Sequence, residues 1–208
     1  MNTQKFNIPI MRKLQGFSTF AILSFFTFLT LNSCTGSQAV PEPVSLNITK
    51  TYYYFDGPVK IRCRLYPAES FYLTTGDFKA PVIPEGRAIY NSPNFRIIQK
   101  LSSDINGNNV SYASYEFPVF LDDGGERLLF KGGVLVVFRP EVKEDEIDSF
   151  FAENNISSYN KHETYFNTYI VPTYPGISAL NVANQLYQPE ITSISTPDKI
   201  MFNTAKNK

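Results

Sequence analysis

Histidine and cysteine are scarce in this chain of 208 residues, which has one His and two Cys. A serine-protease site needs a nucleophile, a base and an orienting acid. The only histidine, His162, lies in a polar stretch, and no glycine-rich nucleophile turn occurs in the sequence. We interpret His162 as a solvated turn residue. Zinc-ligand spacing and a phosphate-binding glycine loop are also missing, so we predict a protein that is not an enzyme and has no cofactor or metal.

An excess of basic charge is missing as well, since 19 Lys and Arg balance 19 Asp and Glu. The first 33 residues hold three basic and no acidic side chains, Lys5, Arg12 and Lys13. The remainder therefore has 19 − 3 = 16 basic and 19 acidic side chains, a net charge of −3. Binding to nucleic acid requires a marked basic excess, so we predict no nucleic-acid partner.

A long hydrophobic run is also lacking, because the charge-free stretch Phe17–Leu31 has only fifteen residues. A helix that crosses a membrane needs roughly 20 apolar residues. A basic start followed by a short apolar run is typical of a secretory signal. Met11 stands directly before Arg12 and Lys13, so translation could begin there instead of at Met1. The alternatives are an uncleaved membrane anchor and a plain secretory signal.

The run ends in Leu31-Asn32-Ser33-Cys34, which resembles the lipobox of bacterial lipoproteins. Asn32 departs from the pattern, because a small residue is commoner at its position. The resemblance implies a signal peptide over 1–33, a lipid on Cys34, the lipid bilayer as a partner, and a place on the outer side of the bacterial cell envelope. With Cys34 acylated, Cys63 has no partner for an intrachain disulfide.

Residues 34–50 contain Pro41 and Pro43 and read as an extended tether. Residues 51–121 are predicted to be rich in β-structure. Aromatic residues favour a strand at Tyr52–Phe55, and Asp56-Gly57 is a hairpin turn signal. The alternation over Val59–Leu65 directs Cys63 into a core as a small hydrophobe. The cations between these apolar positions, Lys60, Arg62 and Arg64, form either a solvated face, which we favour, or a surface for anions or lipid head groups.

From Asp122 onwards the pattern becomes regular and predicts the order βαββαβ. Asp122–Gly125 is a hairpin turn, too short for a twelve-residue calcium loop. The expected elements are strands at Gly133–Phe138, Ile156–Tyr159, Tyr165–Val171 and Ile191–Ile194, and helices at Lys143–Asn154 and Ser178–Tyr187. We therefore predict an α+β protein, in which residues 122–196 form a ferredoxin-like domain with a four-stranded antiparallel sheet and two helices on one face. Residues 197–208 are predicted to be an extended tail.

The same region resembles the N-terminal prodomain, of the fervidolysin-like type, of subtilisin-like serine proteases. The likeness rests on Glu126–Glu141, Glu144–Asn154, Thr168–Val171 and Gly176–Tyr187, whereas Ile191–Pro197 departs from the usual ending of the family. The resemblance implies a bare sheet face that docks on two helices of a protease, and a tail that lies in the active cleft. It also implies a role as folding template or inhibitor. The tail residues that it assigns to partner binding are Thr196, Pro197, Asp198, Lys199 and Ile200.

Two alternatives remain open from the sequence. The chain could be a non-catalytic binding or structural module of the envelope, with Tyr52–Phe55 as the working surface, because one fold hosts many functions. It could also be the detached front part of a split subtilisin-like protease.

Overall fold

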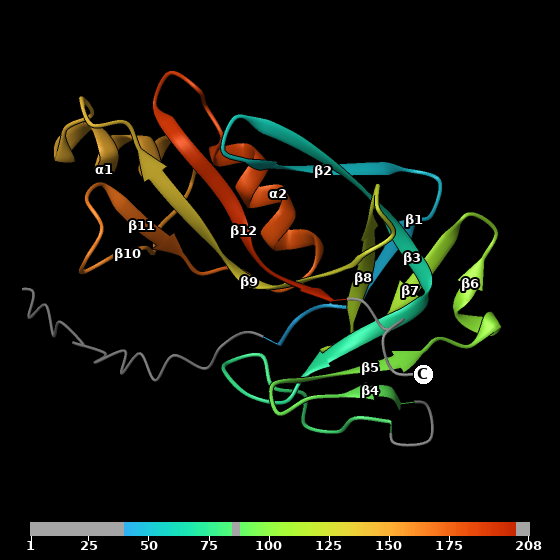
Figure 1. Ribbon diagram of the computed structural model, residues 1–208. Coiled ribbons are helices and arrows are strands. Elements are labelled where there is room, and N and C mark those ends of the chain that lie inside the picture. Colours follow the sequence, from blue (N-terminus) through green and yellow to red (C-terminus); the bar gives the residue numbers. More distant parts are fainter. Residues whose placement is uncertain (1–39, 85–87, 203–208) are drawn as a thin grey trace, which may run out of the picture. The chain divides into compact units, whose positions relative to one another are not determined.

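The computed structural model describes residues 40–84 and 88–202. The predicted signal peptide and Cys34 lie outside these residues. The described part is α+β, as predicted, with two α-helices and strands that pair antiparallel in two sheets (Figure 1). One sheet has three strands and the other has nine.

The first half contributes eight strands. They are β1 (Val44–Asn47), β2 (Thr51–Asp56), β3 (Val59–Leu73), β4 (Ala88–Asn91), β5 (Phe95–Gln99), β6 (Ile105–Asn106), β7 (Asn109–Tyr112) and β8 (Phe117–Asp122). The second half contributes β9 (Arg127–Phe138), α1 (Glu144–Glu153), β10 (Asn160–Lys161), β11 (Thr168–Val171), α2 (Ile177–Leu186) and β12 (Thr192–Phe202). The order βαββαβ predicted for this half is confirmed.

The central strand of the large sheet is β9, which lies between β11 and β12 (Figure 1). On one edge it pairs with β12 in two stretches, from Arg127 to Phe130 and from Val134 to Phe138. On the other edge it pairs first with β8, at Arg127 and Leu128, and then with β11, from Val134 to Val137. Strand β2 pairs with β3 and also lies against β12, where Lys199 Nζ lies 3.2 Å from Asp56 Oδ2.

Two hydrophobic clusters pack against the helices. One contains Tyr54, Phe120 and Phe130 together with Leu180 of α2, so it joins residues of both halves of the chain. The other contains Phe138, and it includes Phe151 of α1 and Leu186 of α2. Helix α2 therefore contributes to both clusters, through Leu180 in the first and Leu186 in the second.

Local sequence signals account for both helices. The backbone N–H of Lys143 donates to Glu146 Oε2 at 2.8 Å, which satisfies a donor at the start of α1. The acidic first turn of α1 also suits the positive end of the helix dipole. Gly176 precedes α2 with φ 73°, and its N–H donates to Phe130 O at 2.7 Å. That bond fixes the start of α2 against β9.

The predicted four-stranded sheet is wrong in its extent, since the sheet that contains β9 has nine strands. The border that was expected between residues 121 and 122, where the β-rich region meets the ferredoxin-like domain, falls inside the β8–β9 hairpin. The expected strand Ile156–Tyr159 is also wrong, because the strand is Asn160–Lys161. At the N-terminal side, the expected tether overlaps β1, whose Val44–Asn47 pair with β7.

Candidate functional site: the uncovered face of the sheet

The side chains of β9 alternate between two faces. Val134, Val136 and Phe138 are buried in the cluster that includes both helices. Leu135 and Val137 point to the opposite face, and both remain only half-buried. Both helices therefore cover the same face of β9, and neither helix covers the opposite face.

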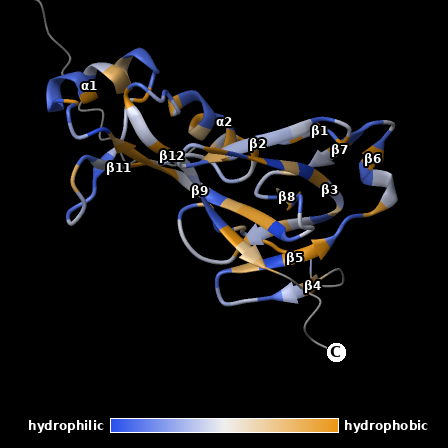
Figure 2. Ribbon diagram, turned by 45° about the horizontal axis from the view of Figure 1, so that its top comes forward, coloured by the Kyte–Doolittle hydropathy of each residue, from blue (hydrophilic) through white to orange (hydrophobic). Residues whose placement is uncertain are grey.

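Neighbouring strands extend this second face. Leu135 lies opposite Ile170 of β11 and Thr196 of β12, and Val137 lies opposite Thr168 and Ile194. Directly opposed residues in antiparallel strands share a face. We call the surface formed by Leu135, Val137, Ile170, Ile194 and Thr196 the outer face. Ile170, on β11, is the most exposed of these residues at 42%, and Figure 2 colours much of β9 and β11 as hydrophobic.

The turn before β11 carries two strongly exposed aromatic side chains, Tyr165 (64% exposed) and Phe166 (74% exposed). The next residue, Asn167, has φ 47° and a buried side chain. Its Nδ2 donates to Arg139 O and Val142 O, each at 3.2 Å. These bonds fix the turn, so the two aromatic rings are presented from a defined backbone.

The residues assigned to a partner-binding tail lie in a paired strand. Thr196 pairs with Leu135, Pro197 with Val134, Lys199 with Phe130 and Ile200 with Leu129. Asp198 occupies a bulge and forms an ion pair with Lys131 at 3.0 Å. These residues therefore do not form an unpaired tail that begins at Thr196 or Pro197, because β12 continues to Phe202.

His162 lies in the β10–β11 turn, as expected. Its Nδ1 accepts a hydrogen bond from the Thr164 backbone N–H at 3.2 Å, and its ring lies 4.7 Å from the Tyr165 ring. Its ring therefore contributes to the geometry of the turn. In the described part of the chain no cluster of three metal-ligating side chains occurs.

Cys63 points into the core, as predicted, and is 2% exposed. Burial, together with the smaller effect of the nearby Asp123 and Asp122, raises the pKa of its thiol from 9.0 to about 12. A thiol that stays protonated is a poor nucleophile. Cys63 therefore acts as a small hydrophobic residue.

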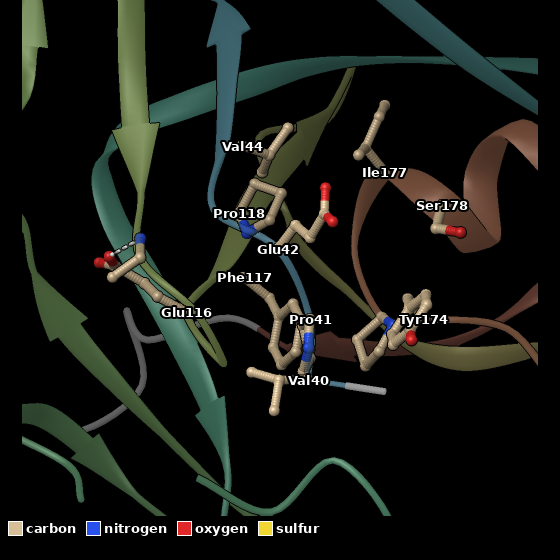
Figure 3. Close-up of a pocket in the computed structure, with 12 residues that line it drawn as sticks. Val40, Pro41, Glu42, Val44, Glu116, Phe117, Pro118, Tyr174, Ile177 and Ser178 are labelled. Atoms are coloured by element: carbon tan, nitrogen blue, oxygen red, sulfur yellow. Dashed lines mark hydrogen bonds between the residues drawn. The ribbon is translucent and has the colours of Figure 1, made fainter. Parts of the chain in front are cut away.

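A separate cavity of about 340 Å³ lies between the segment that leads into β1 and the start of α2 (Figure 3). Its lining is mostly apolar and includes Phe117, Pro118 and Tyr174. The carboxylate of Glu42 lies near Ile177, whereas that of Glu116 accepts a hydrogen bond from the Ala113 backbone at 2.9 Å (Figure 3). Tyr174 and Ser178 are the other polar side chains of the lining.

No protein-family model matches this chain, and no curated protein or solved structure was found to match it. No helix of the described residues is long and apolar enough to cross a membrane.

Part of this site follows from the sequence and part does not. The strand at Gly133–Phe138 was expected from the pattern, and the bare sheet face was expected from the resemblance. The exposed Tyr165–Phe166 turn was missed, because Tyr165–Val171 read as one strand. The one available signal was Asn167, a residue type that tolerates positive φ.

Proposed function

We propose that this chain is a lipid-anchored protein of the bacterial cell envelope that binds a protein partner through the outer face. The partner class is a subtilisin-like protease, which the chain inhibits or helps to fold. The observation that carries the proposal is the one-sided covering of β9. The helices bury Val134, Val136 and Phe138, whereas Leu135 and Val137 have no helix above them.

The strand order supports the prodomain-like assignment. Within the larger sheet, the last four strands lie in the order β12-β9-β11-β10, and each neighbouring pair is antiparallel. With one helix after β9 and one after β11, this is the order of a split βαβ, ferredoxin-like unit. The proposal therefore treats residues 127–202 as a ferredoxin-like unit whose sheet has been extended by β8 and its neighbours.

The composition of the outer face supports a protein partner. Leu135, Val137, Ile170 and Ile194 supply apolar contacts, and the adjoining turn offers Tyr165 and Phe166. Aromatic residues at the centre of apolar patches commonly dominate binding energy. Exposed apolar surface of this kind marks an interaction site.

The membrane anchor in this proposal is Cys34. Pro41 is already buried, so the folded part begins no more than seven residues after Cys34 in the sequence. Six residue steps separate Cys34 from Val40, and an extended chain spans at most about 3.5 Å per step, or about 21 Å in all. In this proposal the outer face therefore meets partners that work near the bilayer surface.

Inhibition of proteases tests the proposal. The processed chain from residue 35 onwards is mixed with a panel of subtilisin-like proteases, and cleavage of a chromogenic peptide is followed. We expect micromolar or tighter inhibition of at least one protease. Ile170→Arg should weaken it at least tenfold, because a charge is placed on the most exposed apolar residue of the outer face.

Ile89→Arg is the matched control, since Ile89 is 48% exposed on β4 and outside the outer face. It should leave inhibition unchanged. No inhibition by the parent chain at micromolar concentration, or equal losses in the two variants, would exclude the proposal. The anchor is tested separately by labelling cells with a radioactive fatty acid, since Cys34→Ala should abolish incorporation of the label.

The alternative surface, Tyr52–Phe55, has less support as a binding site. Tyr52 and Tyr54 are buried, and the Phe55 ring stacks on Tyr187 with centroids 3.9 Å apart. These rings are occupied in packing within the molecule. An envelope module that works through an aromatic patch at this strand is therefore the weaker candidate.

A further inference from the structure

Two cavities adjoin at the loop that leads into α2. The first, of about 340 Å³, is the one in Figure 3, and the second has about 320 Å³. Both are lined by Tyr174 and Ser178, so they border each other. The other residues that line the second cavity are Phe78, Ile156, Pro172, Thr173 and Val182. We call the two cavities together the apolar groove. Each is in the size range of pockets that hold small molecules.

The walls of the apolar groove are already formed. The rings of Phe78 and Tyr174 lie 5.1 Å apart. The N–H of Gly176 donates to Phe130 O at 2.7 Å, which fixes the loop between Tyr174 and α2. Phe117, in the wall of the first cavity, is 5% exposed. Walls that need no ordering on binding favour affinity.

The charged side chains of the lining favour a neutral ligand. Glu116 is engaged within the molecule, because its carboxylate lies 2.9 Å from Lys100 Nζ and its side chain is 6% exposed. Glu42 is exposed, and its carboxylate lies near Ile177 in the first cavity (Figure 3). A free fatty acid would bring a second negative charge beside Glu42, which repels it. A fatty acyl chain in ester linkage brings no charge.

An acyl chain also suits the apolar part of the lining. It carries no hydrogen-bond donors or acceptors along its length, whereas a peptide backbone enclosed between Ile156, Pro172 and Val182 would need partners for its N–H and C=O groups. Each methylene group that enters the groove is removed from water, which is favourable. Val40, which is 58% exposed at the first cavity, would be covered as well.

The position of the groove in the chain identifies a source for such an acyl chain. Val40 and Pro41 line the first cavity, and six residue steps separate Val40 from Cys34. At about 3.5 Å per step, the lipid proposed on Cys34 is attached within about 21 Å of Val40. A ligand on so short a tether has an effective concentration on the order of millimolar. It therefore has an advantage over free ligands of equal intrinsic affinity.

We propose that the apolar groove holds one fatty acyl chain of the lipid on Cys34 while the protein is away from the bilayer. This inference rests on the membrane-anchor part of the proposed function, and it does not depend on the outer face. It adds that the folded part shields a portion of its own anchor from water.

A chain that starts at Cys34 and carries a ten-carbon alkyl group on the Cys34 sulfur tests this inference. Cys63 is 2% exposed, so it stays unmodified. The matched control carries a carbamidomethyl group on Cys34. The methyl NMR signals of Ile177 and Val182, one in each cavity, are compared between the two forms. We expect both signals to shift in the decyl form, to the same extent at every protein concentration, because the alkyl group belongs to the same molecule.

A pair of substitutions locates the effect. Ser178→Arg places a large charged side chain where the two cavities meet, so it should reduce the decyl-dependent shift of Ile177 at least fivefold. Ile89→Arg, on β4 and outside the groove, should leave the shift unchanged. Circular dichroism of both variants checks that the fold is retained.

Monodecanoylglycerol, a free neutral probe, distinguishes the source of the acyl chain and needs no substitution. It should shift the Ile177 and Val182 signals of the carbamidomethyl form in a saturable way. It should bind the decyl form at least tenfold more weakly, because the tethered chain already fills the groove. Unchanged methyl signals in the decyl form, or equal binding of the probe by the two forms, would each overturn the inference.

The outcomes separate this inference from the proposed function. If cells incorporate no fatty acid at Cys34, the proposed anchor and the inference fail together. If Cys34 is labelled in cells but the decyl form shows no shifts, the inference alone fails. Inhibition of a protease tests the outer face and bears on neither result.

Discussion

Replacing Lys100 with methionine should remove the positive half of a buried ion pair. Its Nζ lies 2.9 Å from Glu116 Oε1, and the two side chains are 3% and 6% exposed. The ammonium group also donates to Ser111 O at 2.6 Å. Glu116 accepts two further hydrogen bonds, from Ser70 Oγ at 2.6 Å and from the Ala113 N–H at 2.9 Å. After the substitution, the buried carboxylate would retain only these two neutral donors.

The size of the loss in unfolding free energy follows from the burial of the ion pair. Breaking a buried ion pair costs about 3–5 kcal/mol, since one charge is left without its partner. The two remaining hydrogen bonds to Glu116 place Lys100→Met near the lower end, at about 3 kcal/mol of unfolding free energy. For a chain of this size a urea slope of about 2 kcal/mol/M converts this into a midpoint about 1.5 M lower.

Urea unfolding of the processed chain, followed by circular dichroism, measures the effect. The double variant Lys100→Met/Glu116→Leu should be less destabilised than the sum of the two single variants by about 2 kcal/mol, because no charge stays buried. Arg62→Met is the control. Its partner Asp123 lies 3.3 Å away, but the side chains are 67% and 70% exposed, so the loss should stay within about 1 kcal/mol. A loss below about 1 kcal/mol for Lys100→Met, or additive single effects, would refute the reasoning.

Three further predictions concern stability. The Tyr112 hydroxyl is buried without a hydrogen-bond partner among the described residues, so Tyr112→Phe should leave the thermal midpoint unchanged or raise it; a clear decrease would contradict this. Gly176→Ala should lower the free energy of unfolding in urea by about 2–4 kcal/mol, because the new Cβ would lie 2.8 Å from Pro118 Cδ and the backbone has φ 73°. Gly57→Ala is the control: its Cβ would point into open space at φ 56°, so it should cost only about 1 kcal/mol. Burial raises the pKa of Cys63 from 9.0 to about 12 and the pKa of Tyr54 from 10.0 to about 12. As the pH rises, the unfolded chain therefore loses these two protons before the folded chain does, so the free energy of unfolding should be constant below pH 9 and decline towards pH 12. A flat alkaline profile would argue against burial of both groups.

Local patterns predicted most elements of the second half of the chain. The helix expected at Lys143–Asn154 forms as α1, and it buries Ile147, Phe150 and Phe151. The period of two in Val59–Leu65 predicted the buried position of Cys63. Such predictions succeed where a segment has one buried and one exposed face, because burial then imposes the period of the element.

Prolines misled the interpretation of the longer strands. Pro197 was expected to end the last strand, yet β12 runs on to Phe202. Pro67 likewise lies inside a strand, β3. In both places the register shifts nearby, between Pro197 and Lys199 and between Leu65 and Ser70. A bulge or an edge tolerates the missing N–H of proline, and neither is visible in a single sequence.

Long-range pairing decided the rest of the fold and the site. The extent of the sheet depends on β8 and β3, whose pairing joins Phe71 to Phe117. The Tyr165–Phe166 turn depends on hydrogen bonds from Asn167 to the carbonyls of Arg139 and Val142. Neither contact follows from local periodicity, because each joins residues that are more than twenty positions apart.

The cluster that joins Tyr54, Cys63 and Phe120 to Phe130 and Leu180 has a consequence for attempts to isolate the prodomain-like region. A fragment that starts at Asp122 would lose the strands that cover Phe130 and Leu180, and would present these side chains to water. Such a fragment should aggregate, whereas co-expression of the two halves should restore a soluble heterodimer. Any transplantation of this module into another protein must therefore carry the first half with it.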